Sequence, residues 1–102
     1  MTNTVNDTED WINLNYSVWY KVKNGICTIV GRSNNDIMLT AGDYTKVAIL
    51  PIEISPSVPI MFSVNNLGGN NATFVGRIEN GEVLIYCLNA VAFWSFSVTY
   101  TI

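Results

Sequence analysis

The chain has 102 residues, of which 49% are hydrophobic and only 13% are charged, and its formal net charge is −3 at pH 7. This length allows one domain with a single core, and the hydrophobic content excludes a disordered chain. The sequence contains no histidine, which excludes Ser-His and Cys-His catalytic pairs and histidine-containing zinc and haem sites. We therefore expect neither a metal nor a cofactor.

The distribution of charge argues against nucleic acid and membranes as partners. The sequence has five Lys and Arg residues against eight Asp and Glu, and three of these acids, Asp7, Glu9 and Asp10, precede residue 11. Nucleic-acid binding needs clustered cations, and the sequence has no such cluster. The longest uninterrupted apolar run is six residues, 83–88, whereas a membrane-spanning helix needs about 18. We expect no nucleic-acid partner and no membrane insertion.

Extended structure is expected along most of the chain, because Val, Ile and Thr together account for 31 of the 102 residues and favour strands. Residues 1–8 are predicted to form a flexible N-terminal segment, and residues 9–102 a single β-sandwich domain. The first strand is predicted at 11–14.

The first hairpin is predicted around Asn24-Gly25, because an Asn-Gly pair tolerates the positive φ angles of a type I′ turn. Counting outward from this turn pairs Val22 with Cys27 on the core face and Trp19 with Val30 on the opposite face. The second of these strands is expected to end at Gly31.

Further strands are predicted at 45–50 and 59–65, followed by a loop at 66–71 that is rich in Asn and Gly. A second Asn-Gly turn, Asn80-Gly81, predicts another hairpin. Its pairing directs Ile78, Val83 and Ile85 into the core and places Val75 opposite Tyr86, and Arg77 opposite Leu84, on the other side. The last segment alternates, so one buried row is expected from Trp94, Phe96, Val98, Tyr100 and Ile102.

About eight short strands with regular turns predict an all-β fold, either an antiparallel β-sandwich or a jelly roll. Cys27 and Cys87 both lie on predicted core faces. We expect buried free thiols at these positions, with a disulfide or a catalytic thiol as the alternatives.

The faces opposite the core are unusually apolar for a solvated sheet. Three explanations remain open: loops of the same chain cover these residues, a second copy covers them, or they form a platform for a ligand. If copies associate, we expect an interface formed by some of five residues, namely Trp19, Val30, Val75, Leu84 and Tyr86.

The order of several motifs resembles the C-terminal β-sandwich head domains of tail fibre and receptor-binding proteins from phages of Gram-positive bacteria. The resemblance covers residues 11–102. It rests on Trp11-Ile12-Asn13-Leu14, Trp19-Tyr20-Lys21-Val22, Asn24-Gly25, Ile29-Val30-Gly31, Leu50-Pro51 with Pro56, Ile78-Glu79-Asn80-Gly81-Glu82-Val83 and Ser97-Val98-Thr99-Tyr100-Thr101-Ile102.

The resemblance implies a homotrimer that binds a host cell-wall saccharide and is not an enzyme. It also implies a location at the phage tail tip, and therefore in the virion. The alternative is a purely structural tail, baseplate or bacterial surface module with no ligand of its own. Glycoside hydrolysis would need two facing carboxylates in a cleft. Neither Asp36 with Asp43 nor Glu79 with Glu82, across an exposed hairpin tip, fits that requirement well.

A saccharide site combines an aromatic ring with planar polar or charged side chains. The sequence offers such residues at several positions, although Asn pairs also build loops. The candidates are Trp19, Tyr44, Tyr86, Asn34, Asn35, Asp36, Asn70, Asn71 and Arg77.

Overall fold

The computed structural model describes residues 7–67 and 74–102. These residues form eight strands and one short 3-10 turn, and the described part of the chain contains no α-helix. In chain order the elements are β1 (Ile12–Asn15), β2 (Val18–Lys23), β3 (Ile26–Leu39), β4 (Asp43–Ile49), η1 (Ile52–Ile54), β5 (Ile60–Asn66), β6 (Phe74–Glu79), β7 (Glu82–Cys87) and β8 (Val91–Thr101).

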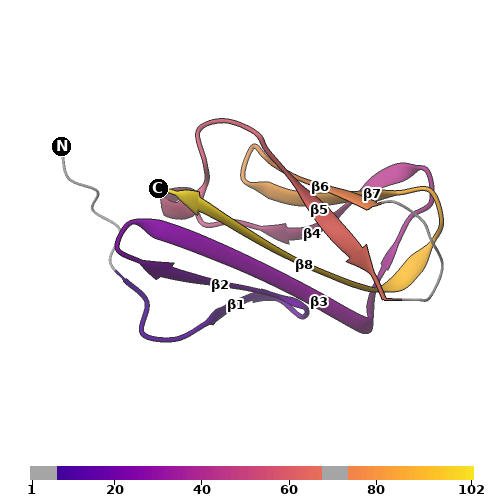
Figure 1. Cartoon of the computed structure of the whole chain (residues 1–102), viewed down its shortest axis with the longest axis horizontal. Helices are drawn as coiled ribbons and strands as arrows, with labels where there is room; N and C mark the ends of the chain where they lie inside the picture. Colours follow the sequence, from indigo (N-terminus) through magenta and orange to yellow (C-terminus); the bar gives the residue numbers. More distant parts are fainter. Residues whose placement is uncertain (1–6, 68–73) are drawn as a thin grey trace.

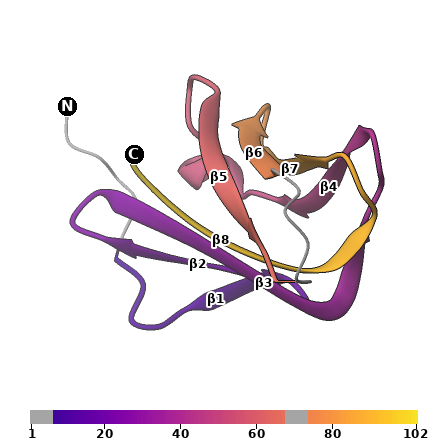
Figure 2. The ribbon, with the colours of Figure 1, turned by 45° about the vertical axis from the view of Figure 1, so that its right-hand side comes forward.

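All neighbouring strands are antiparallel, in the order β1-β2-β3-β8-β5-β6-β7-β4. The sheet folds into two layers that enclose the core (Figures 1 and 2). β5 belongs to both layers, because residues Ile60 to Val64 pair with β6 and residues Asn65 and Asn66 pair with β8. The predicted all-β antiparallel sandwich is therefore confirmed, although β8 lies between β3 and β5, and β4 pairs with β7 at the sheet edge.

Both predicted hairpins are confirmed. Asn24 and Gly25 have φ angles of 53° and 75°, and Asn80 and Gly81 have the same two values. The registers agree with those counted from the turns, with Val22 opposite Cys27 and Ile78 opposite Val83. A two-residue turn with positive φ at both positions matches the twist of the strands that it joins.

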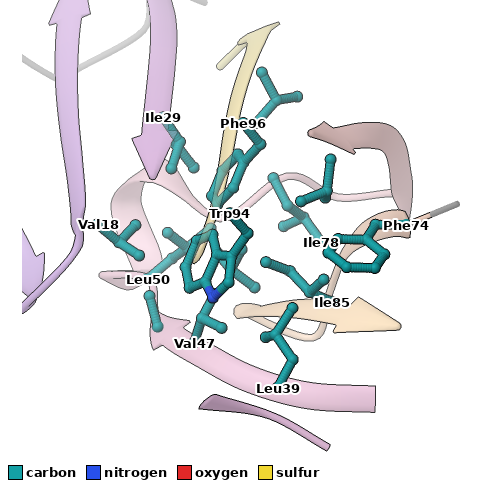
Figure 3. Close-up of a cluster of buried hydrophobic side chains, with 14 of the residues drawn as sticks. Val18, Ile29, Leu39, Val47, Leu50, Phe74, Ile78, Ile85, Trp94 and Phe96 are labelled. Carbon is teal, nitrogen blue, oxygen red and sulfur yellow. The ribbon is translucent and has the colours of Figure 1, made fainter. Parts of the chain in front are cut away.

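The core lies between the two layers and is centred on Trp94, whose side chain is fully buried (Figure 3). Of the buried row predicted on β8, Trp94, Phe96, Val98 and Tyr100 are buried, whereas Ile102 is half-buried and packs at the edge of the core. The Trp94 indole nitrogen donates a 3.0 Å hydrogen bond to the Ile37 carbonyl. Cys27 and Cys87 are buried free thiols, as predicted.

The largest departure from the predicted strands is the length of β3, which continues from Gly31 to Leu39. Asn34, Asn35 and Asp36 lie within this strand, so treating them as loop residues is wrong. The pairing of β3 with β8 is irregular between Asn34 and Leu39, and Asn35 has a φ of 71°. A bulge of this kind inserts extra residues without ending the strand, and Asn tolerates the left-handed conformation that it requires.

Candidate functional site

The two layers present two outward faces, one on each side of the core. We call the outward side chains of β1, β2, β3 and β8, together with Trp11, the tryptophan face. We call the outward side chains of β4, β5, β6 and β7 the tyrosine face, after Tyr44 and Tyr86. Because side chains alternate along a strand, the register assigns each residue to a face.

The tryptophan face is built from rows of side chains that cross neighbouring strands. One row contains Trp19, Val30 and Ser97, and the next contains Lys21, Thr28 and Thr99. The Thr28 and Thr99 hydroxyls lie 3.3 Å apart and share a hydrogen bond. The face therefore combines an aromatic ring, an aliphatic side chain and hydroxyl groups on three adjacent strands.

Trp11 lies next to this face, immediately before β1. The segment before it is joined to β2, because the Thr8 backbone nitrogen donates to the Val22 carbonyl at 2.9 Å and the Val22 nitrogen donates to the Thr8 hydroxyl at 3.1 Å. The Trp11 side chain is 43% exposed, and the Lys21 ammonium lies 6.0 Å from its ring centroid. Such an arrangement is a cation–π contact.

Two shallow depressions meet at Trp11. The larger, of about 460 Å³, is lined by Trp11, Lys21, Lys23, Asn24, Ile26 and Thr28. The smaller, of about 280 Å³, is lined by Trp11, Trp19 and Val30. The first combines the apolar side chains of Trp11 and Ile26 with two lysines, an amide and a hydroxyl, and the second is aromatic and aliphatic. A ligand that spans both would contact Trp11, which lines both depressions.

The strands of the tryptophan face carry more cations than acids. Its strands contribute Lys21, Lys23 and Arg32, which are three of the five cations of the chain. None of these three forms an ion pair with a carboxylate of the described residues. Asp7, Glu9 and Asp10 precede Trp11, and the Asp7 carboxylate accepts a 2.8 Å hydrogen bond from the Asn24 backbone nitrogen. Cations that are not engaged in ion pairs can still bind anionic groups.

The tyrosine face has a different character. The rings of Tyr44 and Tyr86 lie 5.4 Å apart between centroids and are tilted by 57°. The Arg77 guanidinium carbon lies 5.7 Å from the Tyr44 centroid, and the same guanidinium forms an ion pair with Glu79. These contacts within the chain already occupy one face of Tyr44 and the charge of Arg77.

The structure separates the residues that the sequence suggested for a saccharide site. Trp19 lies on the tryptophan face, whereas Tyr44, Tyr86 and Arg77 come together on the opposite face. Asn34, Asn35 and Asp36 lie at the bulge of β3, where the Asp36 carboxylate accepts a 3.2 Å hydrogen bond from the Ser17 hydroxyl. Asn70 and Asn71 lie outside the described residues.

The five residues suggested for an interface also divide between the two faces. Trp19 and Val30 lie on the tryptophan face, and Val75, Leu84 and Tyr86 lie on the tyrosine face. All five are half-buried. One flat contact therefore cannot include all of them.

The sequence reasoning missed Trp11, Lys21 and Lys23 as site residues. The signal was present for the two lysines, because the pairing around Asn24-Gly25 places both on the outward face with Trp19. Trp11 could have been added from its place at the start of a strand that pairs with β2.

Within the described residues, no three side chains of the His, Cys, Asp or Glu type gather closely enough to hold a metal ion. Nor is any helix in this part of the chain long and apolar enough to cross a bilayer. The chain matches no family model, no curated protein and no solved structure. The site is therefore defined by its own geometry, as an open platform with Trp11 and Trp19 at its centre.

Proposed function

We propose that this chain is a non-enzymatic binding domain that holds a cell-surface saccharide on its tryptophan face. The observation that carries the proposal is the position of Trp11, exposed between one depression of about 460 Å³ and another of about 280 Å³. A sugar ring presents C–H groups on one side, and these pack against the flat surface of an indole.

The residues around the two tryptophans supply the polar part of such a site. Thr28, Thr99 and Asn24 provide hydroxyl and amide groups that can bond to sugar hydroxyls. Lys21, Lys23 and Arg32 favour a saccharide with acidic substituents, because a carboxylate or phosphate forms charge-assisted hydrogen bonds with ammonium and guanidinium groups. We therefore propose an acidic saccharide rather than a neutral one.

The biological setting that we propose follows from the motifs of residues 11–102. They resemble the head domains of phage receptor-binding proteins, which supports a homotrimer at the tail tip of a virion and a host cell-wall saccharide as the ligand. An open platform on a rigid sheet suits this role, because it can contact a long polymer at any point along its length. A structural tail or surface module without a ligand is the alternative.

A glycan array carrying acidic and neutral bacterial cell-surface saccharides tests the proposal. The parent protein is expected to bind acidic saccharides, and Trp11→Ala to weaken binding on the order of tenfold. Tyr44→Ala serves as the matched control, because it removes an aromatic side chain from the opposite face.

Loss of binding in Tyr44→Ala with full binding in Trp11→Ala would move the site to the tyrosine face. An array with no bound saccharide at all would favour the structural alternative. Binding to neutral saccharides alone would contradict the role given to the three cations.

A further inference from the structure

We propose that Asn24 is a site of spontaneous deamidation in the folded protein, and that it reacts faster than Asn80 in the equivalent turn. Both asparagines are exposed at the tip of a hairpin, and each is followed by a glycine. A following glycine leaves the asparagine side chain open to attack, because glycine has no side chain of its own. The contacts that hold the two turns distinguish the two sites.

The reaction needs only the chain and water. The backbone nitrogen of Gly25 attacks the side-chain amide carbon of Asn24, so that a nitrogen–carbon bond forms and the bond to the amide nitrogen breaks. Ammonia leaves with the proton that the Gly25 nitrogen carried, and a five-membered succinimide ring remains. Water then opens the ring at either carbonyl, which gives aspartate or isoaspartate. No electron is transferred in either step.

The turn has to open before this ring can close. The ring includes the backbone between the two residues and holds it in a conformation that differs from that of a two-residue turn. In the folded chain both residues of each turn have positive φ angles, 53° for the asparagine and 75° for the glycine. The rate at each site therefore depends on how readily its turn opens, and opening is easiest where few buried contacts are lost.

The turn at Asn24-Gly25 is held from outside by partners that water can reach. The Asn24 backbone nitrogen donates to the Asp7 carboxylate at 2.8 Å, and the Ile102 nitrogen donates to the Gly25 carbonyl at 2.9 Å. Asp7 is exposed, Ile102 is half-buried, and both lie outside the strands. Local opening that breaks such solvated contacts costs little.

The turn at Asn80-Gly81 is anchored to the core instead. The Gly81 carbonyl accepts a 2.7 Å hydrogen bond from the backbone nitrogen of Leu50, whose side chain is 5% exposed. Gly81 also packs closely, because a side chain added there would begin 3.3 Å from the Ser55 hydroxyl oxygen. Opening this turn disturbs a residue of the core cluster, so Asn80 reacts more slowly than Asn24.

Deamidation at Asn24 changes the charge of the larger depression. Asn24 lines it together with Trp11, Lys21 and Lys23, and the Asp7 carboxylate already lies against the Asn24 backbone. Either product adds a second carboxylate to this depression, which the two lysines also line. The functional consequence rests on the saccharide proposed above, because an added negative charge weakens the binding of an acidic ligand.

Peptide mass spectrometry measures both rates in one sample, after incubation of the folded protein at mildly alkaline pH and digestion at acidic pH. Asn24 is expected to react faster than Asn80 on the order of tenfold, because its turn opens more readily. In urea, where neither turn is formed, the two rates should approach each other. Equal rates in the folded protein would overturn the inference, as would a faster rate at Asn80 or an Asn24 that stays intact.

Asp7→Ala tests the contact that holds the first turn. Asp7 is exposed, so the variant should fold, and the loss of the hydrogen bond to Asn24 should raise the rate at Asn24. The rate at Asn80 should not change, and it reports whether the rest of the domain is intact. An unchanged rate at Asn24 in this variant, or an equal rise at both sites, would contradict the role given to this contact.

Asn24→Asp reproduces one product of the reaction, and Asn80→Asp is its matched control in the other turn. On the glycan array Asn24→Asp should bind acidic saccharides more weakly than Asn80→Asp on the order of fivefold, the effect of one partly exposed charge. Equal binding by the two variants would overturn the consequence for the depression. A parent protein that binds no saccharide would contradict the proposed function alone, because neither deamidation rate depends on a ligand.

Discussion

The ring of Phe96 lies directly over the backbone of Gly31 on the neighbouring strand, in the space that a side chain at Gly31 would fill. The same arrangement recurs in the other layer, where Phe62 lies over Gly76. The two phenylalanine rings then meet, with 4.8 Å between their centroids. Each glycine thus makes room for one aromatic ring, and the paired rings join the two layers.

Gly31→Ala is expected to destabilise the domain, because the added Cβ overlaps the Phe96 ring. Overpacking in a well-packed core costs about 1–3 kcal/mol. The free energy of unfolding, measured by urea denaturation, should fall by this amount. In a Phe96→Leu variant the ring is gone, so Gly31→Ala should cost less stability there than it does in the parent. Equal urea midpoints for Gly31→Ala and the parent would show that the ring does not occupy this space.

Tyr100 connects the end of β8 to η1. Its hydroxyl donates a 2.6 Å hydrogen bond to the Ile54 carbonyl in the buried core. Tyr100→Phe leaves that acceptor buried without a partner, which costs about 1–3 kcal/mol. Thermal denaturation should show a lower Tm for Tyr100→Phe than for the parent. A Tm that does not change would mean that water replaces the hydroxyl at this position.

Stability is expected to decrease at alkaline pH. Burial raises the pKa of Tyr100 above its ordinary value of 10.0, and interaction with Cys27 raises it further. Burial also raises the pKa of the Cys27 thiol above 9.0. The unfolded chain therefore loses these protons at a lower pH than the folded chain does. Their contribution to stability is complete below about pH 9 and is lost as the pH rises beyond the unfolded values.

The urea midpoint, measured in steps from pH 7 to pH 11, should be level at first and then fall. Tyr100→Phe removes one of the two groups, so its midpoint should fall less steeply above pH 10. A parent midpoint that rises over this alkaline range would contradict the assignment of both groups to the core.

The hairpin turns allow a separate test of backbone conformation. Gly81 has a φ of 75°, which a β-branched residue adopts only with strain. Gly81→Val should cost about 1–3 kcal/mol of stability, whereas Asn80→Gly should cost less because glycine accepts positive φ at either position. Equal unfolding free energies for Gly81→Val and the parent would argue against a type I′ turn.

The parts of the fold that depend on local pattern could be predicted from the sequence. At Asn24-Gly25 and Asn80-Gly81 the turn fixes the register, and alternation then assigns each residue to a face. The insertion of β8 between β3 and β5 could not be predicted in this way, because pairing between distant strands leaves no local signal. The bulge at Asn35 was also missed, since a run of Asn and Asp is equally typical of a loop.

The candidate site was only partly predictable for the same reason. Trp19 was placed on an outward face by the first hairpin, but its relation to Tyr44, Tyr86 and Arg77 depends on how the two layers pack. The structure shows that they lie on opposite sides of the core. Counting from the first turn places Lys21 and Lys23 on the same face as Trp19, so the sequence alone already indicates cations on this platform.

The central claim, that Trp11 and Trp19 hold a saccharide, is tested most directly by the indole N–H signals in nitrogen–proton NMR spectra. The chain has three tryptophans, and the buried Trp94, bonded to the Ile37 carbonyl, is an internal reference. Titration with an acidic saccharide selected on the array should shift the Trp11 and Trp19 signals and leave the Trp94 signal in place. Saturable binding with no shift at Trp11 or Trp19 would contradict the claim.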